Sequence, residues 1–189
     1  MSSAQRRDLN ARQAETVERL LRAGAEELRA VGVDALTIRS VAVRAGVSAA
    51  TAYTYFGSKN HLFAELFWRA LVQDPAPAPT GGTAVERLGQ VTRRMGTMLA
   101  ESPELAAGAT SALLGTDPEV SRLRLRIGME FVERFRAALG DDPEPAVLDA
   151  LALAFSGALL QAGMGLMTYT EMAERLDPVV AAIMKGHVA

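Results

Sequence analysis

Two short helices joined by a tight turn are indicated by the tract from Leu36 to Lys59, LTIRSVAVRAGVSAATAYTYFGSK. Thr37 can cap the first helix, because its hydroxyl can accept a hydrogen bond from a backbone N–H of the first turn. Gly46 suits the turn, since glycine tolerates the positive φ at which such a helix ends. Ser48 can cap the second helix. The first helix carries three apolar residues at helical spacing: Ile38, Val41 and Ala42.

The second helix is predicted to present a slim polar face to solvent. At about 100° per residue, Ala52 and Phe56 lie on its inner side, and Val47 packs beneath them from the turn. Such a helix can enter a DNA major groove, which is roughly 12 Å wide, and can offer methyl groups and hydroxyls to base edges or phosphates. The outer side carries small or hydroxyl-bearing residues: Ala50, Thr51, Tyr53 and Thr54.

The run T-x-R-x-V-A-x-x-A-G-V-S-x-x-T-x-Y-x-Y-F-x-S-K closely resembles the amino-terminal domain of the TetR family of transcriptional regulators. This resemblance covers roughly residues 10 to 70, and beyond them it is one of architecture only. Ala50 stands where the family often has glycine, which could alter base preference. Ala52 stands where a larger aliphatic residue is frequent, which could bring the helix closer to its neighbour.

The resemblance implies a set of DNA-contacting residues. Thr37 and Lys59 are expected to contact phosphate, and Arg39 phosphate or guanine, because a guanidinium can donate to both acceptors of guanine. Helix N-termini at Ser48 and near Ser58 would direct backbone N–H groups at phosphate. The full predicted set is Thr37, Arg39, Ser48, Ala49, Ala50, Thr51, Tyr53, Thr54, Tyr55 and Lys59.

Alternatives stay open for several of these side chains. Tyr53 and Tyr55, taken without the surrounding motif, are half-buried packing residues with hydrated hydroxyls. Arg44 is expected to be a solvated or structural charge. Ahead of the first helix lies a polar leader, which either frays in solvent or touches the minor groove, and its arginines are Arg6, Arg7 and Arg12.

The fold class is predicted to be all-α, because no alternating strand pattern or hairpin signal occurs. The prolines and glycines of residues 74–82, DPAPAPTGG, exclude a continuous helix there. We therefore expect a helix-turn-helix DNA-binding domain at 1–73, a linker at 74–82, and a helical effector-binding and dimerisation domain at 83–189.

Capping residues and apolar spacing predict the other helices. In the first domain we expect one helix at about Ala11–Val31, stopped by Gly32, and another at about Lys59–Val72. The buried stripe of the first of these helices is predicted to be Val17, Leu20, Leu21, Gly24, Leu28 and Val31. In the second domain we expect five helices. The first runs from Thr83 to about Ala100, the second starts at Ser102 and Pro103, and the third runs from Asp117 to Gly140. The fourth starts at Asp142 and Pro143 and continues to about Thr168, and the fifth starts at Thr170 or Glu171 and continues to about Lys185.

Charge and composition limit the class of protein. Residues 1–73 carry ten Arg and Lys against seven Asp and Glu, and the rest carries ten against fifteen, for a net −2. A basic first third on an acidic body is typical of a modular DNA binder. The chain has no cysteine, and His61 and His187 are too far apart in sequence to suggest a metal-ligand pair. We expect a cytoplasmic protein without a cofactor or metal, and no catalytic motif indicates an enzyme.

Residues 150–167 are eighteen long and uncharged, which is enough for a membrane span by length. Their small residues, the internal Ser156 and Gln161, and the lack of a following basic cluster favour close packing of helices in a water-soluble protein. The family resemblance implies that the last two long helices pair across a twofold axis, so we expect a homodimer and no membrane contact.

Methionines in the second domain suit an adaptable apolar pocket, although any single one is better explained by core or dimer packing. The family resemblance implies a small-molecule effector between these helices. Residues 50–69 also resemble regulators of sterol and fatty-acid catabolism, which favours a lipid-like effector. The predicted lining is Trp68, Met95, Met98, Leu99, Leu113, Phe131, Phe135, Gln161 and Met164, with Gln161 as a polar anchor.

The sequence therefore predicts a homodimeric transcriptional repressor that an apolar effector releases from a palindromic operator. One alternative is a helical carrier or sensor of an apolar ligand without significant DNA binding, which the salt dependence of duplex binding would distinguish. Another is an enzyme of the helical body, which would need an acid–base pair converging in a pocket.

Overall fold

A computed structural model describes residues 3–74 and 78–186, with side chains described from residue 11 onward. Throughout these ranges the regular structure is helical and contains no strand, so the predicted all-α class is confirmed. The helices are α1 (Ser3–Ala35), α2 (Ile38–Arg44), α3 (Ala49–Tyr55), α4 (Lys59–Gln73), α5 (Ala84–Glu101), α6 (Pro103–Leu114), α7 (Pro118–Leu139), α8 (Pro145–Gly163) and α9 (Tyr169–Lys185).

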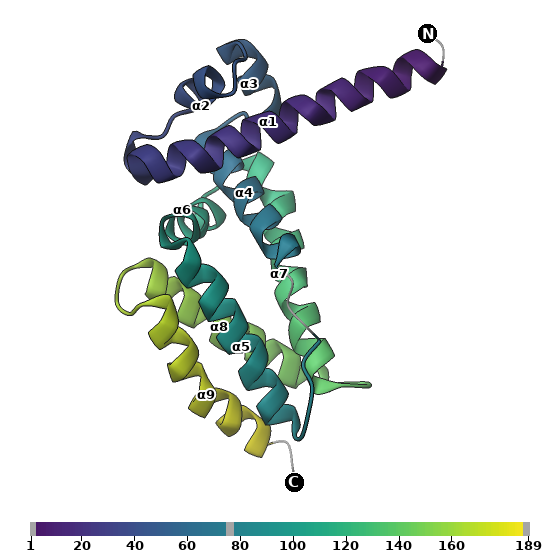
Figure 1. The fold of residues 1–189 in the computed structure, drawn as a ribbon. Coiled ribbons are helices and arrows are strands. Elements are labelled where there is room, and N and C mark those ends of the chain that lie inside the picture. Colours follow the sequence, from purple (N-terminus) through teal and green to yellow (C-terminus); the bar gives the residue numbers. More distant parts are fainter. Residues whose placement is uncertain (1–2, 75–77, 187–189) are drawn as a thin grey trace.

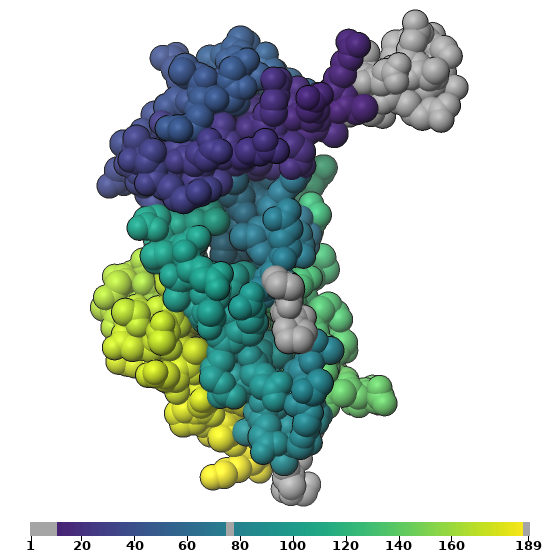
Figure 2. Space-filling model, viewed as in Figure 1, coloured from purple at the N-terminus to yellow at the C-terminus, as the bar shows by residue number. Residues whose placement is uncertain are grey.

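The helices form a small head at one end of an elongated body (Figure 1). α1 lies across the end of the molecule, with α2 and α3 on its outer side and α4 running from beneath it along the body. α5 to α9 make up the body, and the amino-terminal part of α1 extends sideways beyond the other helices of the head. The space-filling view shows the head as a separate lobe above the body (Figure 2).

One apolar cluster holds the head together. Ala52 and Phe56, the predicted inner pair of α3, are 0% and 3% exposed, so that prediction is confirmed. Val31, predicted for the α1 stripe, is 43% exposed, because the helix geometry breaks at the next residue, Gly32, where φ is 76°. α1 also starts at Ser3 and not near Ala11, since the residues before Ala11 have no apolar periodicity to mark them as helix.

The body has a second, larger apolar cluster, to which α4 through α9 contribute. Close helix approach depends on Gly96 of α5, where an added Cβ would lie 2.8 Å from the Cβ of Ala173 on α9. Small residues at this crossing let the two backbones come together, as they do in close helix packing generally. α5 and α9 thus form one side of the body (Figure 1).

Three predicted boundaries in the body are wrong: the start of α8, its end at about Thr168, and the start of α9. α8 begins at Pro145, with Glu144 as its N-cap, and not at Pro143. Asp142, the residue before Pro143, has a positive φ of 50°, which lies outside helical geometry. The same helix ends at Gly163, and Gly165 takes a φ of 76° in the turn that follows. α9 is capped by Thr168, whose hydroxyl accepts from the Glu171 backbone N–H at 3.1 Å, and not by Thr170 or Glu171.

The head and body share packing residues across their junction. Phe63 of α4 belongs to the head cluster, and its ring covers Gly108 of α6, where an added Cβ would lie 3.1 Å from ring carbons. Ala112 of α6 also belongs to the head cluster. Because α4 and α6 serve both lobes, the division at residues 74–82 stays a prediction.

Candidate nucleic-acid interface

The first helix of the predicted helix-turn-helix begins with a reciprocal cap. The Thr37 hydroxyl accepts from the Ser40 backbone N–H at 3.0 Å, and the Thr37 N–H donates to the Ser40 hydroxyl at 3.1 Å. This pair satisfies two backbone donors that the start of a helix would otherwise leave open. Thr37 is exposed, and its hydroxyl serves the cap only as an acceptor, so its O–H remains available to donate to a DNA phosphate.

The turn between the two helices matches the sequence prediction. Gly46 has a φ of 65°, and the Val47 N–H donates back to the Ala42 carbonyl at 3.0 Å. Ser48 then caps α3 by accepting from the Thr51 backbone N–H at 3.0 Å, and its hydroxyl lies 2.8 Å from the Thr51 hydroxyl. The amino-terminal turn of α3 is therefore fixed by hydrogen bonds that its own sequence supplies.

The outer face of α3 is open to solvent. Ala49, Ala50 and Thr54 are exposed, and the Tyr53 side chain is 46% exposed. The Thr54 hydroxyl donates to the Ala50 carbonyl at 3.0 Å, which leaves its oxygen and methyl group facing outward. Tyr55 is half-buried against the head cluster. A narrow surface of small side chains with two projecting hydroxyls is compatible with entry into a major groove.

Lys59 lies at the start of α4 and is partly held by the protein. Its Nζ donates to the Asp34 backbone carbonyl at 3.2 Å and lies 5.9 Å from the centre of the Phe63 ring. The ammonium group retains two further donors for phosphate, because a lysine has three. Ser58 caps α4 by accepting from the His61 N–H at 2.9 Å.

α2 contributes one exposed cation and one charge with a structural role. Arg39 is exposed, and Val43, one turn further along the helix, is an 81% exposed apolar residue that the sequence prediction did not include. Its spacing of four residues from Arg39 was the signal that could have identified it. Arg44 donates to Glu27 of α1 at 2.7 Å, which confirms the structural alternative for Arg44.

The Arg44–Glu27 contact fixes α2 against α1. Glu27 is only 7% exposed, and the hydrogen bond from Arg44, followed by the influence of Ser40, holds the pKa of its carboxyl below the usual value. A carboxylate in this position is stabilised in its charged form by its partner. This ion pair adds to the apolar cluster of the head in holding α2 against the long α1 helix.

The arginines of the polar leader are only partly described. Arg12 lies on the exposed surface of α1. The side chains of Arg6 and Arg7 lie outside the described residues, and so does His187. Among the described residues, no group of three or more His, Asp or Glu side chains could hold a metal ion.

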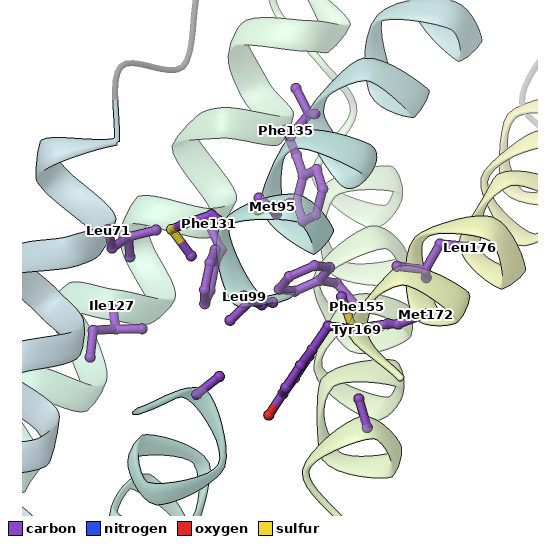
Figure 3. Packing of buried hydrophobic residues seen from close by; sticks show 14 of the residues in the cluster. Leu71, Met95, Leu99, Ile127, Phe131, Phe135, Phe155, Tyr169, Met172 and Leu176 are labelled. Carbon is purple, nitrogen blue, oxygen red and sulfur yellow. The ribbon is translucent and has the colours of Figure 1, made fainter. Parts of the chain in front are cut away.

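In the body, the structure brings together most of the predicted effector-lining residues but leaves two outside. Met95, Leu99 and Phe135 are at most 1% exposed, and Phe131 packs with Phe155 at a ring distance of 4.9 Å. Figure 3 shows these side chains meeting in the interior. The other members of the predicted set that contact this cluster are Met98, Trp68 and Leu113.

Gln161 and Met164 do not reach that interior. Gln161 is exposed, and Met164 is 58% exposed at the carboxyl end of α8. Gln161 lies on the exposed side of α8, next to the buried Ala162, and Met164 caps the carboxyl end of that helix. The prediction of Gln161 as a polar anchor inside the pocket is therefore wrong for this chain.

A recess of about 250 Å³ opens between α4, α5 and α6. Its lining includes the apolar Phe67, Met98 and Leu99 together with the ion pair between Asp74 and Arg94. Figure 2 shows the surface hollowed where α4 meets α5 and α6. Leu99 also belongs to the packed core, so it lies at once in the lining of the recess and in the interior.

α4, which carries the head, is joined to α7 at three points. The Ser58 hydroxyl donates to the Asp117 carboxylate, and this contact is the main cause of a lowered Asp117 pKa. In the middle of α4, the Arg126 guanidinium lies 4.3 Å from the centre of the Trp68 ring.

The third point lies at the end of α4. Asp74 accepts from Arg134 of α7 at 3.0 Å and also from Arg94 of α5. Arg134 donates in addition to the Leu71 carbonyl at 2.6 Å. These contacts couple the position of α4, and with it the head, to the helices of the body.

The chain resembles known regulators along most of its length. A family model described as bacterial regulatory proteins, tetR family, matches residues 20–66. An uncharacterized HTH-type transcriptional regulator of Mycobacterium tuberculosis is 42% identical over 179 residues, which are 94% of this chain and 84% of that protein. The HTH-type transcriptional repressor KstR of Mycolicibacterium smegmatis is 26% identical over 161 residues, 81% of this chain and 79% of that repressor.

Solved structures share the fold. A TetR transcriptional regulator from Rhodococcus superposes with a TM-score of 0.79 at 19% sequence identity. The match covers 94% of this chain and 99% of the chain of that regulator. FadR of Thermus thermophilus, a repressor crystallised with lauroyl-CoA, superposes with a TM-score of 0.67 at 22% sequence identity. That match covers 91% of this chain and 95% of the FadR chain.

Proposed function

Because this chain belongs to the TetR family of bacterial transcriptional regulators, we propose that it is a homodimeric repressor released from a palindromic operator by a small apolar effector. The observation that carries the DNA-binding part is the exposed outer face of α3, which is capped by Ser48 and made of small side chains and Tyr53. We assign base or phosphate contacts to the predicted residues of this face. Lys59 and Arg39 supply additional phosphate contacts at its edges.

The proposal includes dimerisation through α8 and α9. α8 is long and apolar enough to cross a membrane by length and composition, with a mean hydropathy of 1.6, yet only 28% of it is buried within the single chain. Leu153 is 74% exposed and Val179 of α9 is 41% exposed. An exposed apolar stripe on two neighbouring helices is typical of a protein–protein interface. Pairing of two chains on this stripe would bury α8 in a water-soluble, cytoplasmic dimer.

Dimer geometry would determine operator binding. Two heads related by a twofold axis bind half-sites whose centres lie about one turn of DNA apart, roughly 34 Å, or a multiple of it. Residues 1–73 are proposed as the DNA-binding domain, residues 74–82 as the linker, and residues 83–189 as the effector-binding and dimerisation domain. A change in the angle of α4 would alter the separation of the two heads.

Effector release follows from the contacts of α4. Ser58, Trp68 and Asp74 join α4 to α7, and Phe63 of α4 covers Gly108 of α6. An apolar molecule that enters beside Leu99 and Phe67 would separate α4 from α5 and α6. It would favour whichever head separation best accommodates it, and this difference in affinity would shift the dimer away from DNA. Thermus FadR, with its bound lauroyl-CoA, indicates that this fold can hold a long acyl chain.

A gel-shift titration tests the proposal. The purified protein is mixed with DNA that adjoins its own gene and with a random duplex library, at several salt concentrations. The wild-type protein should select an inverted repeat, and its affinity should fall steeply as salt rises. Tyr53→Phe combined with Lys59→Ala should weaken binding about tenfold or more and reduce the salt slope by about one.

Arg136→Ala is the matched control, because Arg136 is exposed on the body and, within the described part of the chain, pairs with the neighbouring Glu133. It should leave the affinity for DNA unchanged. Equal binding by the wild type and the Tyr53/Lys59 double variant would contradict the assigned surface. No DNA binding by a wild-type dimer that still binds an apolar ligand would instead support a carrier.

A further inference from the structure

The hydroxyl of Tyr169 is a buried polar group with no hydrogen bond. Tyr169 is the first residue of α9 and is 6% exposed, and its Oη finds no partner of acceptable geometry among the described residues. The Thr110 hydroxyl of α6 lies nearby, but it donates to the Ala106 carbonyl at 2.8 Å, and its position relative to Tyr169 does not meet hydrogen-bond geometry. Buried polar groups in folded proteins are nearly always paired, so an exception calls for an explanation.

The hydroxyl lies inside the apolar body. Figure 3 shows the Tyr169 ring directed away from α9 into the interior, beside Phe155 and Leu99. All three belong to the same buried cluster. Leu99 also forms part of the lining of the recess between α4, α5 and α6. A molecule that enters the recess and displaces the Leu99 side chain would therefore approach the Tyr169 hydroxyl.

The surroundings of the hydroxyl favour a neutral partner. Among the described residues no lysine or arginine is buried as a whole residue, and the cation that lines the recess, Arg94, is already paired with the Asp74 carboxylate. A buried carboxylate without a cation would be strongly disfavoured. Burial also raises the pKa of Tyr169, with a smaller opposite effect from Thr110, so the phenol stays protonated and available as a donor.

We propose that Tyr169 is the polar anchor of the effector site, and that it donates a hydrogen bond to an uncharged oxygen, a ketone or ester carbonyl or a hydroxyl, on an otherwise apolar molecule. This inference rests on the proposed function, since it names the chemistry of the same effector. It places the anchor at the start of α9, beyond the turn that follows the exposed Gln161 and Met164. A free fatty acid does not fit this site, because its carboxylate would find no unpaired cation there to bind.

The test uses two probes of equal chain length, 2-dodecanone and dodecanoate, titrated calorimetrically into the full-length protein. The wild type should bind 2-dodecanone at least roughly tenfold more tightly than dodecanoate. Tyr169→Phe removes only the hydroxyl and should weaken binding of 2-dodecanone roughly five- to tenfold. Ser111→Ala, which removes an exposed hydroxyl from α6, should leave it unchanged.

A second measurement needs no ligand. Because the Tyr169 hydroxyl is unpaired, Tyr169→Phe should unfold at the same temperature as the wild type or higher. A lower unfolding temperature would mean that the hydroxyl is already satisfied in the free protein and would overturn the inference. So would equal affinity of wild type and Tyr169→Phe for 2-dodecanone, or tighter binding of dodecanoate.

The outcomes separate the two proposals. If neither probe binds while the wild type still binds its operator, the inference and the effector part of the function both fail, and the DNA-binding part stands. If 2-dodecanone binds through Tyr169 but no DNA is bound, the proposed function fails and the anchor stands.

Discussion

The Nη1 atom of Arg134 donates to Oδ2 of Asp74 at 3.0 Å and joins the carboxyl-terminal part of α7 to the end of α4. Asp74 is the residue at which α4 ends, and its side chain is only 2% exposed. It also accepts from Arg94 of α5, so one carboxylate serves two guanidinium groups. The end of the helix that carries the head is thus fixed to two helices of the body.

Removing the shared carboxylate should be costly. Asp74→Ala leaves two partly buried guanidinium groups close together without their acceptor, and we expect a loss of about 3 kcal/mol in the free energy of unfolding. Urea denaturation measures this loss. Asp177→Ala is the control, because the Arg93–Asp177 pair is 53% and 42% exposed and should contribute less than about 1 kcal/mol. Equal losses for the two variants would show that Asp74 does not hold α4.

Two glycines of α5 should respond differently to the same change. In Gly96→Ala the new methyl group would lie 2.8 Å from the Ala173 Cβ and 3.0 Å from the Tyr169 carbonyl, so α9 must move, at a cost of about 1–3 kcal/mol. In Gly89→Ala it would meet only the movable end of the Arg93 side chain. There we expect no loss or a gain of up to about 1 kcal/mol from helix propensity. Thermal unfolding of both variants checks the contrast.

Dimerisation can be tested at a glycine with free space around it. An added Cβ at Gly157 of α8 meets no atom within 4 Å in the single chain, so Gly157→Leu should fold normally and clash only with a partner chain. We expect at least a tenfold weaker dimer, measured by sedimentation, and weaker operator binding with it. Gly128→Leu on α7 has the same free space and lies outside the proposed interface. A dimer unaffected by Gly157→Leu would place the interface elsewhere.

Acid should weaken the head through Glu27. Its pKa is lowered from 4.5, chiefly by Arg44, so its contribution to stability is fully present above pH 4.5 and is lost as the pH falls through the lower value of the folded state. The wild type should therefore lose more stability than Glu27→Gln between about pH 6 and pH 3. Denaturation curves across that range measure the difference. Glu26→Gln, at an exposed neighbouring position, should follow the wild type.

Local sequence predicted the head well because its signals are local. Thr37, Gly46 and Ser48 act within one turn of chain, through caps and a positive φ, and each has the predicted geometry. The boundary near Pro143 was wrong because two Pro-containing starts, at Pro143 and Pro145, lie side by side and only the backbone conformation of Asp142 selects the second. The interior of the body was predicted in part, since apolar residues such as Met95 and Phe135 are buried whichever helices they face.

By itself, the amino-acid sequence determined the helices, the order in which they follow one another and the polar outer side of α3, because caps, turn glycines and apolar spacing act over a few residues. Only the tertiary structure decided that Gln161 faces outward while Tyr169 faces the core, and that Asp74 meets Arg94 and Arg134. Those facts depend on how helices far apart in the chain pack against each other. Packing is set by the shapes of all the side chains together, and no short stretch of sequence contains it.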